Sequence, residues 1–346
     1  MARPLARAGC SLALGALIAG FALLPPAQGG QATTDQSDPG DRSAAKPWNG
    51  KLTKALVRDL RSKRFEVTPG YTRLWTQEGC DDYTYPLLGN CFGNNPASPY
   101  VVPIVKRWSE EYVDPRTEHA LGKVRPGYTG TPRLDPREAI VIFGQMPPAA
   151  RYFGEQSWVF TKQGGWSPTF YNEIASVQPD LVQYLFSSLP PGKGQTGRIV
   201  SFSSVNNNIN NVTIERQSGS VWGQVRYFVV TPDQRMDRAV RSSLKRLGVA
   251  GKAVFTDAIP PADELGSIGP LGLGKRANDF LTFLRYTMPE DEQAGDAWLK
   301  ELPLTILRVR ERPSSQRPAK PYPPSVLDER TAVPEQGLSA SQDQLV

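Results

Sequence analysis

Residues 224–248, QVRYFVVTPDQRMDRAVRSSLKRLG, carry the clearest folding signal in the chain. Residues 224–230 predict a strand, because Val225, Tyr227 and Val229 alternate along one of its sides. The segment that follows has apolar residues at helical spacing, which form one stripe: Met236, Ala239, Val240, Leu244 and Leu247. A strand followed by an amphipathic helix is therefore expected.

The ends of this helix are also marked in the sequence. Thr231 can cap the helix, Pro232 suits its first position, and Gln234 completes a capping-box pattern. Gly248 ends the helix, and residues 252–256 return as a strand. Together these segments predict a βαβ-like unit over residues 224–257.

Further elements are predicted on both sides of this unit. Strands are expected at residues 138–143 (EAIVIF), 157–161, 199–202 and 304–312, and helices at 51–64, 180–188, 277–288 and from Pro289 onward. Residues 65–137 are rich in Pro, Gly, Tyr and Asn, which indicates an irregular, loop-rich stretch. The expected fold class is α+β, a mixed sheet with helices packed on it, with ferredoxin-like elements as one option for the C-terminal half.

Residues 1–29 have the pattern of a secretory signal peptide. Arg3 and Arg7 precede an apolar run at residues 12–24, which Pro25 and Pro26 interrupt before small residues suited to cleavage. The run is short for a membrane span, and no later segment is apolar for long enough to be one. We therefore expect a secreted, extracellular protein without a transmembrane segment.

Composition divides the rest of the chain. Residues 30–47 read as a flexible lead-in, 48–190 as a loop-rich N-terminal half, 198–312 as an α+β half that is separate from or continuous with it, and 313–346 as a loosely attached Pro-, Ser- and Gln-rich tail. The net charge of +6 falls to about +4 when Arg3 and Arg7 are removed. This charge is too mild and dispersed to indicate a nucleic-acid partner.

Two cysteines remain after signal-peptide removal. In an oxidising compartment Cys80 and Cys91 are expected to form a disulfide, and closing so short a loop restricts the unfolded chain by roughly 3 kcal/mol. The alternative, a pair of metal thiolates, lacks further ligands, because the chain has a single histidine, His119. No metal or cofactor is therefore expected.

Most enzyme signatures are missing from the sequence. It contains no G-x-S-x-G, no G-x-G-x-x-G and no complete P-loop pattern. His119 could act as a general base oriented by Glu118 or Asp114, although a plain surface histidine fits the sequence as well. The single histidine excludes any site that is built from two or three histidines.

Two aromatic and polar groups are the candidate binding residues. The first lies around the proposed disulfide, where rings, carboxylates and amides suit a sugar or a peptide, and includes Asp82, Tyr85, Asn94 and Asn95. The second contains Tyr152 and Trp158, which follow the EAIVIF run. The competing interpretation is structural, with Asp and Asn making turns and the aromatic rings packing in the core. The leading hypothesis is a secreted protein that binds extracellular carbohydrate or peptide-like material.

Two other hypotheses stay open. A metal-independent hydrolase could use a carboxylate pair drawn from Asp82, Glu138 and Glu155, provided that they converge. A cell-envelope structural or interaction protein could bind an anionic polymer through basic residues on the 232–247 helix and the last strand, namely Arg235, Arg238, Arg241, Lys245, Arg246, Arg308, Arg310 and Arg312. Asn211-Val212-Thr213 is also an N-glycosylation sequon.

Overall fold

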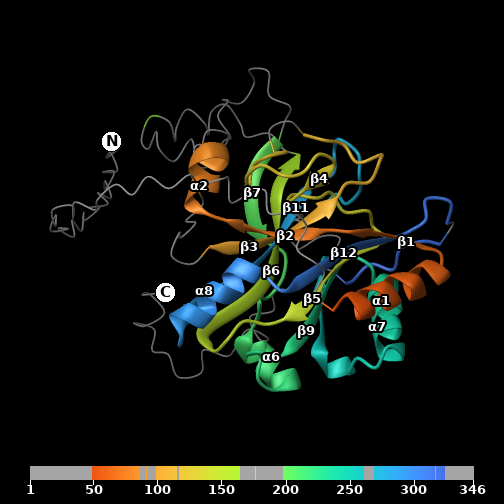
Figure 1. The fold of residues 1–346 in the computed structure, drawn as a ribbon. Helices are drawn as coiled ribbons and strands as arrows, with labels where there is room; N and C mark the ends of the chain where they lie inside the picture. The colour runs from red at the N-terminus through yellow and green to blue at the C-terminus, as the bar shows by residue number, and fades with distance from the viewer. Residues whose placement is uncertain are drawn as a thin grey trace, which may run out of the picture. The chain divides into compact units, whose positions relative to one another are not determined.

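The computed structural model describes residues 49–85, 91, 99–114, 117–163, 176, 198–260, 269–315 and 317–323. The predicted signal peptide, the lead-in, the helix at 180–188 and the candidates Asn94 and Asn95 lie outside these residues. Two β-sheets and the helices packed against them form the described chain, which confirms the predicted α+β class (Figure 1).

The first sheet has five strands. Their spatial order is β1 (Phe65–Pro69), β12 (Leu304–Glu311), β5 (Glu138–Gln145), β9 (Val225–Thr231) and β10 (Val254–Ala258). Neighbours are antiparallel except for β9 and β10, which are parallel. Because a parallel pair needs a crossover, the β9–β10 pairing confirms the predicted βαβ unit.

The second sheet has seven strands and is antiparallel. Its main path is β2 (Tyr71–Trp75), β3 (Tyr100–Lys106), β11 (Asp279–Pro289), β6 (Ala150–Gln163) and β7 (Arg198–Ser204). Two short strands complete it, β4 (Tyr128–Thr129) beside β3 and β8 (Ile209–Asn210) beside β6. β6 and β11 form the longest ladder of the molecule, and it carries the site described below.

Helices α1 (Gly50–Ser62) and α7 (Gln234–Arg246) lie side by side against the outer face of the five-stranded sheet (Figure 1). The shorter helical elements are α2 (Gln77–Gly79), the π-helix η2 (Cys80–Thr84), α6 (Asn211–Ser218), the 3-10 helix η3 (Gly251–Ala253) and α8 (Glu292–Glu301). Among the described residues, no helix is both long enough and apolar enough to cross a membrane.

The main core lies between the two sheets. Strand β5 shows why: Ile140 and Ile142 point to this core, while Val141 and Phe143 face α1 and α7. A strand that is buried on both faces reads as the continuous apolar run EAIVIF. Each fully buried side chain of this size contributes about 1.5–3 kcal/mol of burial free energy, so these two cores hold both sheets and helices together.

The predicted helix of the βαβ unit is confirmed, with a different cap. Asp233 caps α7, because its side chain accepts a hydrogen bond from the backbone N–H of Arg235. Thr231 instead ends β9, and its hydroxyl donates to the backbone oxygen of Glu138 on β5. Gly248 follows the helix with a left-handed φ of 84°, as its C-terminal signal predicts.

Two predictions of secondary structure are wrong. The segment predicted as a helix at 277–288 contains strand β11 (Asp279–Pro289) instead, because the strand is mostly buried on both faces and its apolar residues therefore mimic a helical repeat. The stretch 65–137 is less irregular than predicted, since β1, β2 and β3 lie in it.

The order β9-α7-β10-β11-α8-β12 is that of a ferredoxin-like chain, but β11 belongs to the other sheet, so the four strands do not share one sheet.

The last helix and the start of the predicted tail also differ from expectation. Helix α8 begins at Glu292, capped by Asp291, because Pro289 is still part of β11. Residues 317–322 are attached to α7: the backbone N–H of Lys320 donates to Asp233 at 2.9 Å, and Gln234 donates to Pro321. This part of the predicted tail therefore covers the N-terminal end of α7.

Candidate functional site

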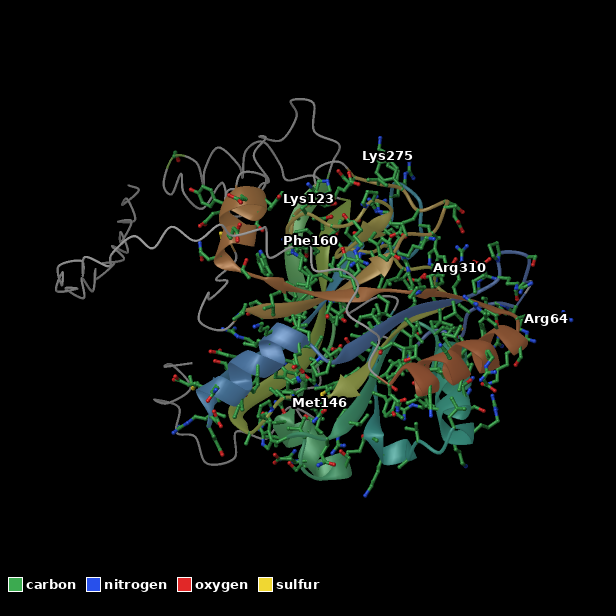
Figure 2. The ribbon with its side chains drawn as sticks, in the orientation of Figure 1. Arg64, Lys123, Met146, Phe160, Lys275 and Arg310 are labelled. Atoms are coloured by element: carbon green, nitrogen blue, oxygen red, sulfur yellow. A yellow bond between two sulfur atoms is a disulfide. The ribbon has the colours of Figure 1, made fainter. Side chains whose placement is uncertain are left out.

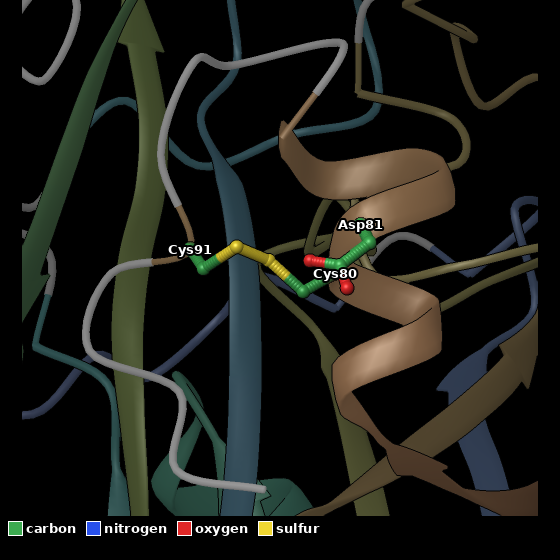
Figure 3. A group of neighbouring side chains, drawn as sticks. All are labelled: Cys80, Asp81 and Cys91. Atoms are coloured by element: carbon green, nitrogen blue, oxygen red, sulfur yellow. A yellow bond between two sulfur atoms is a disulfide. The ribbon is translucent and has the colours of Figure 1, made fainter. Parts of the chain in front are cut away.

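The predicted disulfide is present and joins Cys80 of η2 to Cys91, with Cα atoms 5.8 Å apart (Figure 3). The carboxylate of Asp81 lies beside it. Since the two sulfurs are bonded to each other, they do not offer the thiolates that a metal site would need. Trp75 fixes this segment to the seven-stranded sheet, because its indole N–H donates to the hydroxyl of Thr84 at 3.0 Å.

The candidates near the disulfide are exposed. Asp82 is exposed, and Tyr85 is 56% exposed, which is unusual for so large a ring. Both lie in or directly after η2, whose neighbour Trp75 packs in the sheet. An exposed ring held by a disulfide-anchored turn is suited to contact a ligand.

A row of aromatic and polar side chains shares the outer face of the seven-stranded sheet. The register sets Gly154 opposite Arg285, Gln156 opposite Phe283 and Trp158 opposite Leu281, and cross-strand partners point to the same face. Tyr100 of β3 lies opposite Arg285 on the other side of β11. We call this set the aromatic face: Tyr100, Tyr152, Gln156, Trp158, Asn208, Phe283 and Arg285.

Stacked rings connect the aromatic face to the disulfide segment. Phe283 is its centre, with the rings of Tyr100 at 4.6 Å, Trp158 at 5.4 Å and Trp75 at 5.5 Å between centroids. Trp75 in turn holds Thr84 of η2. The structure thus brings Trp158 and the disulfide segment, two separate sequence predictions, into one packed cluster.

Arg285 is held at one side of the face by Tyr100. Its guanidinium lies 4.7 Å from the centre of the Tyr100 ring and donates a hydrogen bond to the Tyr100 hydroxyl at 2.7 Å. The Nε of Arg285 has no hydrogen-bond partner within the described chain. A buried donor without a partner costs free energy, which an acceptor that reached this atom would offset.

Amides and a phenol complete the aromatic face. The Nδ2 of Asn208 donates to the Tyr152 hydroxyl at 2.9 Å and to the Gln156 side chain at 3.3 Å. The Oδ1 of Asn208 has no partner among the described residues. Burial raises the pKa of Tyr152, so this phenol stays neutral and can donate. Tyr100, Tyr152, Gln156, Trp158, Asn208 and Arg285 are all half-buried and so remain partly accessible.

The predicted carboxylate candidates do not converge. Glu138 is fully buried, where it accepts hydrogen bonds from Trp108 at 2.6 Å and from Arg308 at 3.0 Å. Burial raises the pKa of Glu138 to about 7 against the opposing charge of Arg308, and the second carboxylate bound to Arg308, Glu111, adds to the rise. Glu138 is therefore part of a buried ion-pair network, separate from exposed Asp82.

Glu155 has a different carboxylate partner, Asp257 at the end of β10. Both are fully buried between the two sheets, and burial raises the pKa of each. Asp257 accepts hydrogen bonds from Ser157 and Asn206, and Ser157 also contacts the Thr282 hydroxyl at 2.7 Å. Asp257 was not among the predicted carboxylates, and both side chains of this pair are buried away from solvent in the described structure.

The structure also gives the surroundings of His119 and of two arginines from the predicted basic faces. His119 is exposed, and Glu118, its expected orienting partner, is engaged by Arg107 at 2.8 Å. The prediction that Arg308 and Arg310 form an exposed basic surface is wrong. Both are buried, because Glu111 and Glu138 bind Arg308 while Glu66 and Glu110 bind Arg310.

Comparison with protein families, curated proteins and solved structures finds no match to this chain. The functional interpretation of the site therefore rests on its geometry alone. Sequence reasoning predicted Tyr152 and Trp158 and missed the other residues of the aromatic face, namely Tyr100, Gln156, Asn208, Phe283 and Arg285. Arg285 falls in the segment predicted as a helix, and a strand reading of residues 279–289 would have placed it beside the partners of Trp158. Asn211 is the first residue of α6 and half-buried, and the sequon stays a prediction.

Proposed function

We propose that this chain is an exported protein that binds extracellular carbohydrate through the aromatic face, with peptide-like material as the alternative ligand. The observation that carries the proposal is the side-by-side placement of Tyr100, Phe283 and Trp158 at one sheet surface. Sugar rings present flat C–H surfaces that pack on aromatic rings, and their hydroxyls need paired donors and acceptors around those rings.

The polar groups support the same proposal. The Nε of Arg285 is a donor and the Oδ1 of Asn208 is an acceptor, both buried and without a partner among the described residues, and the Tyr152 hydroxyl can serve as either. All three lie on strands or a strand-adjacent loop of one rigid sheet, so little conformational entropy is lost when a ligand binds. Exposed Tyr85 extends the contact surface from the disulfide segment.

The hydrolase alternative has weaker support. It needs two carboxyl groups that converge at a substrate-accessible position, separated by about 5 to 9.5 Å as in glycosidases. Glu138 is neutralised by Arg308, Asp82 lies apart on η2, and Glu155 meets Asp257 in a fully buried interface. Binding without turnover is therefore the proposed activity.

The test is direct binding of defined oligosaccharides to the purified mature chain. Hexasaccharides of glucose, of xylose and of N-acetylglucosamine are titrated while tryptophan fluorescence and heat are recorded, and unstructured peptides of similar length form the second arm. We expect one saccharide to bind and to change the fluorescence of Trp158. Binding of the peptides alone would support the alternative, and binding of neither would contradict the proposal.

Matched variants locate the site. Trp158→Phe and Arg285→Gln remove the large ring and the free donor, and each is expected to weaken binding about tenfold. Trp222→Phe is the control, because Trp222 is also half-buried but packs on the core between the sheets. Equal losses in Trp158→Phe and Trp222→Phe would show that the aromatic face is not the binding surface.

A further inference from the structure

The last strand carries three arginines at alternate positions, and the third differs from the other two. Arg308 and Arg310 are buried and are bound by four glutamates. Arg312 follows directly after β12, is exposed, and its guanidinium has no ion pair or hydrogen bond within the described chain. The four glutamates therefore neutralise Arg308 and Arg310 but leave the charge of Arg312 unpaired among the described residues.

Arg312 lines a pocket of ≈ 440 Å³ at the end of β12. The other charged residues of its wall are Lys63, Arg64, Arg317 and Glu311. Four cationic side chains against one carboxylate leave a clear positive excess, and Ser314 and Ser315 add hydroxyl donors. Figure 2 labels Arg64 beyond the end of α1 and Arg310 on the strand that leads to the pocket.

The two walls of the pocket are held in place. Arg137 donates to the backbone oxygen of Ser315 at 2.8 Å, which fixes the turn after β12. On the other wall, Arg64 follows α1 with a left-handed φ of 70°, and its backbone N–H donates to Arg61. Lys63 is already engaged by Asp59 and Ser243, and Arg317 forms an ion pair with Glu311 at 3.7 Å. Arg64 and Arg312 are therefore the pocket's cations without an ion pair among the described residues.

A second pocket shares Arg312. It measures ≈ 390 Å³ and runs beside β1, where Arg61, Glu66 and Trp108 are among its lining residues. Arginine forks match phosphate oxygens with two parallel hydrogen bonds, and a phosphate brings more charge than a carboxylate to a site with excess positive charge. Two hollows that meet at one arginine suit a ligand with more than one such group.

We propose that the pocket at the end of β12 binds a ligand that carries several linked phosphate groups, with Arg64 and Arg312 as its principal contacts. This site is separate from the aromatic face and does not depend on the proposed carbohydrate binding. It also gives a defined position to the anionic partner that the basic residues of the sequence suggest.

The test is calorimetric titration of the full mature chain with tripolyphosphate, with inorganic phosphate and citrate as further arms. We expect tripolyphosphate to bind more tightly than inorganic phosphate, with an affinity that falls as salt is added. Citrate carries comparable charge on carboxylates. If citrate binds as tightly as tripolyphosphate, or if tripolyphosphate does not bind, the proposal is wrong.

Charge-matched variants separate the pocket from general attraction. Arg64→Gln combined with Arg312→Gln is expected to weaken tripolyphosphate binding at least about tenfold. Arg216→Gln combined with Arg276→Gln removes the same charge from two exposed positions that do not line the pocket and is expected to leave binding nearly unchanged. Equal losses in the two double variants would overturn the site. All four positions are exposed, so circular dichroism should show folded proteins.

Discussion

The carboxyl group of Glu155 on β6 lies next to that of Asp257 on β10, in the interface between the two sheets. Ser157 and Asn206 donate hydrogen bonds to Asp257, whereas no described residue donates to either oxygen of Glu155. Two buried carboxylates repel each other, and an ionised Glu155 would lack any donor. Glu155 is therefore the protonated member of the pair, and its O–H can donate a hydrogen bond to the carboxylate of Asp257.

This pair predicts that the protein is more stable in acid than at neutral pH. Burial and the charge of Asp257 raise the pKa of Glu155 well above its ordinary value, so the folded state holds a proton that the unfolded state releases above about pH 4.5. Glu155 alone should lower the free energy of unfolding by up to about 1.4 kcal/mol per pH unit as pH rises above about 5. Urea unfolding at a series of pH values measures this slope.

Glu155→Gln should flatten that slope, because the amide is neutral at every pH and can still donate to Asp257. A smaller slope remains from Glu138, whose pKa of about 7 acts in the same direction. Glu215→Gln is the control, since Glu215 is exposed on α6 and its variant should keep the wild-type profile. A wild-type slope in Glu155→Gln would show that the carboxyl pair does not hold the proton.

Arg308 is predicted to be one of the most sensitive positions in the chain. Arg308→Met leaves Glu111 and Glu138 buried without their cation, so we expect a loss of about 3–5 kcal/mol in the free energy of unfolding. Adding Glu138→Gln should recover part of it, because one of the stranded charges is then removed. Arg276→Gln, at an exposed position, should change stability by less than about 0.5 kcal/mol. Similar losses for Arg308→Met and Arg276→Gln would contradict this.

The βαβ unit could be predicted from sequence because its signals are local. Alternation in β9, the apolar stripe of α7 and Gly248 each lie within a few residues of what they specify. Strand β11 could not be recognised, since burial on both faces removes the alternation that identifies a strand. The partner of Glu155 could not be predicted for another reason. Asp257 lies 100 positions after Ser157, its hydrogen-bond donor on β6, and only the packing of the two sheets brings it there.

Gly154→Ala is predicted to weaken carbohydrate binding. A Cβ at this position would lie 2.5 Å from the Tyr152 hydroxyl and 2.6 Å from the Oδ1 of Asn208, so both side chains must move. Losing two aligned hydrogen-bonding groups should weaken binding about five- to tenfold. Gly251→Ala is the matched control, because a Cβ there meets nothing within 4 Å. Wild-type affinity in Gly154→Ala would remove Tyr152 and Asn208 from the site.

Export predicts the N-terminus of the mature protein. Cleavage after Gly29 or after Ala32, the ends of two small-residue patterns that follow the Pro25-Pro26 break, should leave Gly30 or Thr33 as the first residue. Mass spectrometry of protein from the native culture medium measures this directly. An intact chain that begins at Met1 and is recovered from the cytosol would contradict export and the extracellular ligand.

The disulfide is predicted to stabilise the aromatic face as well as the fold. Replacing Cys80 and Cys91 by serine should lower the free energy of unfolding by about 3 kcal/mol, since the short loop is then unrestrained in the unfolded chain. Because η2 is tied to Trp75, and Trp75 to Phe283, the same variant should also weaken saccharide binding. Thr84→Val breaks the Trp75 hydrogen bond while keeping the disulfide. If Thr84→Val leaves binding intact and the double serine variant also does, the disulfide segment plays no part in the site.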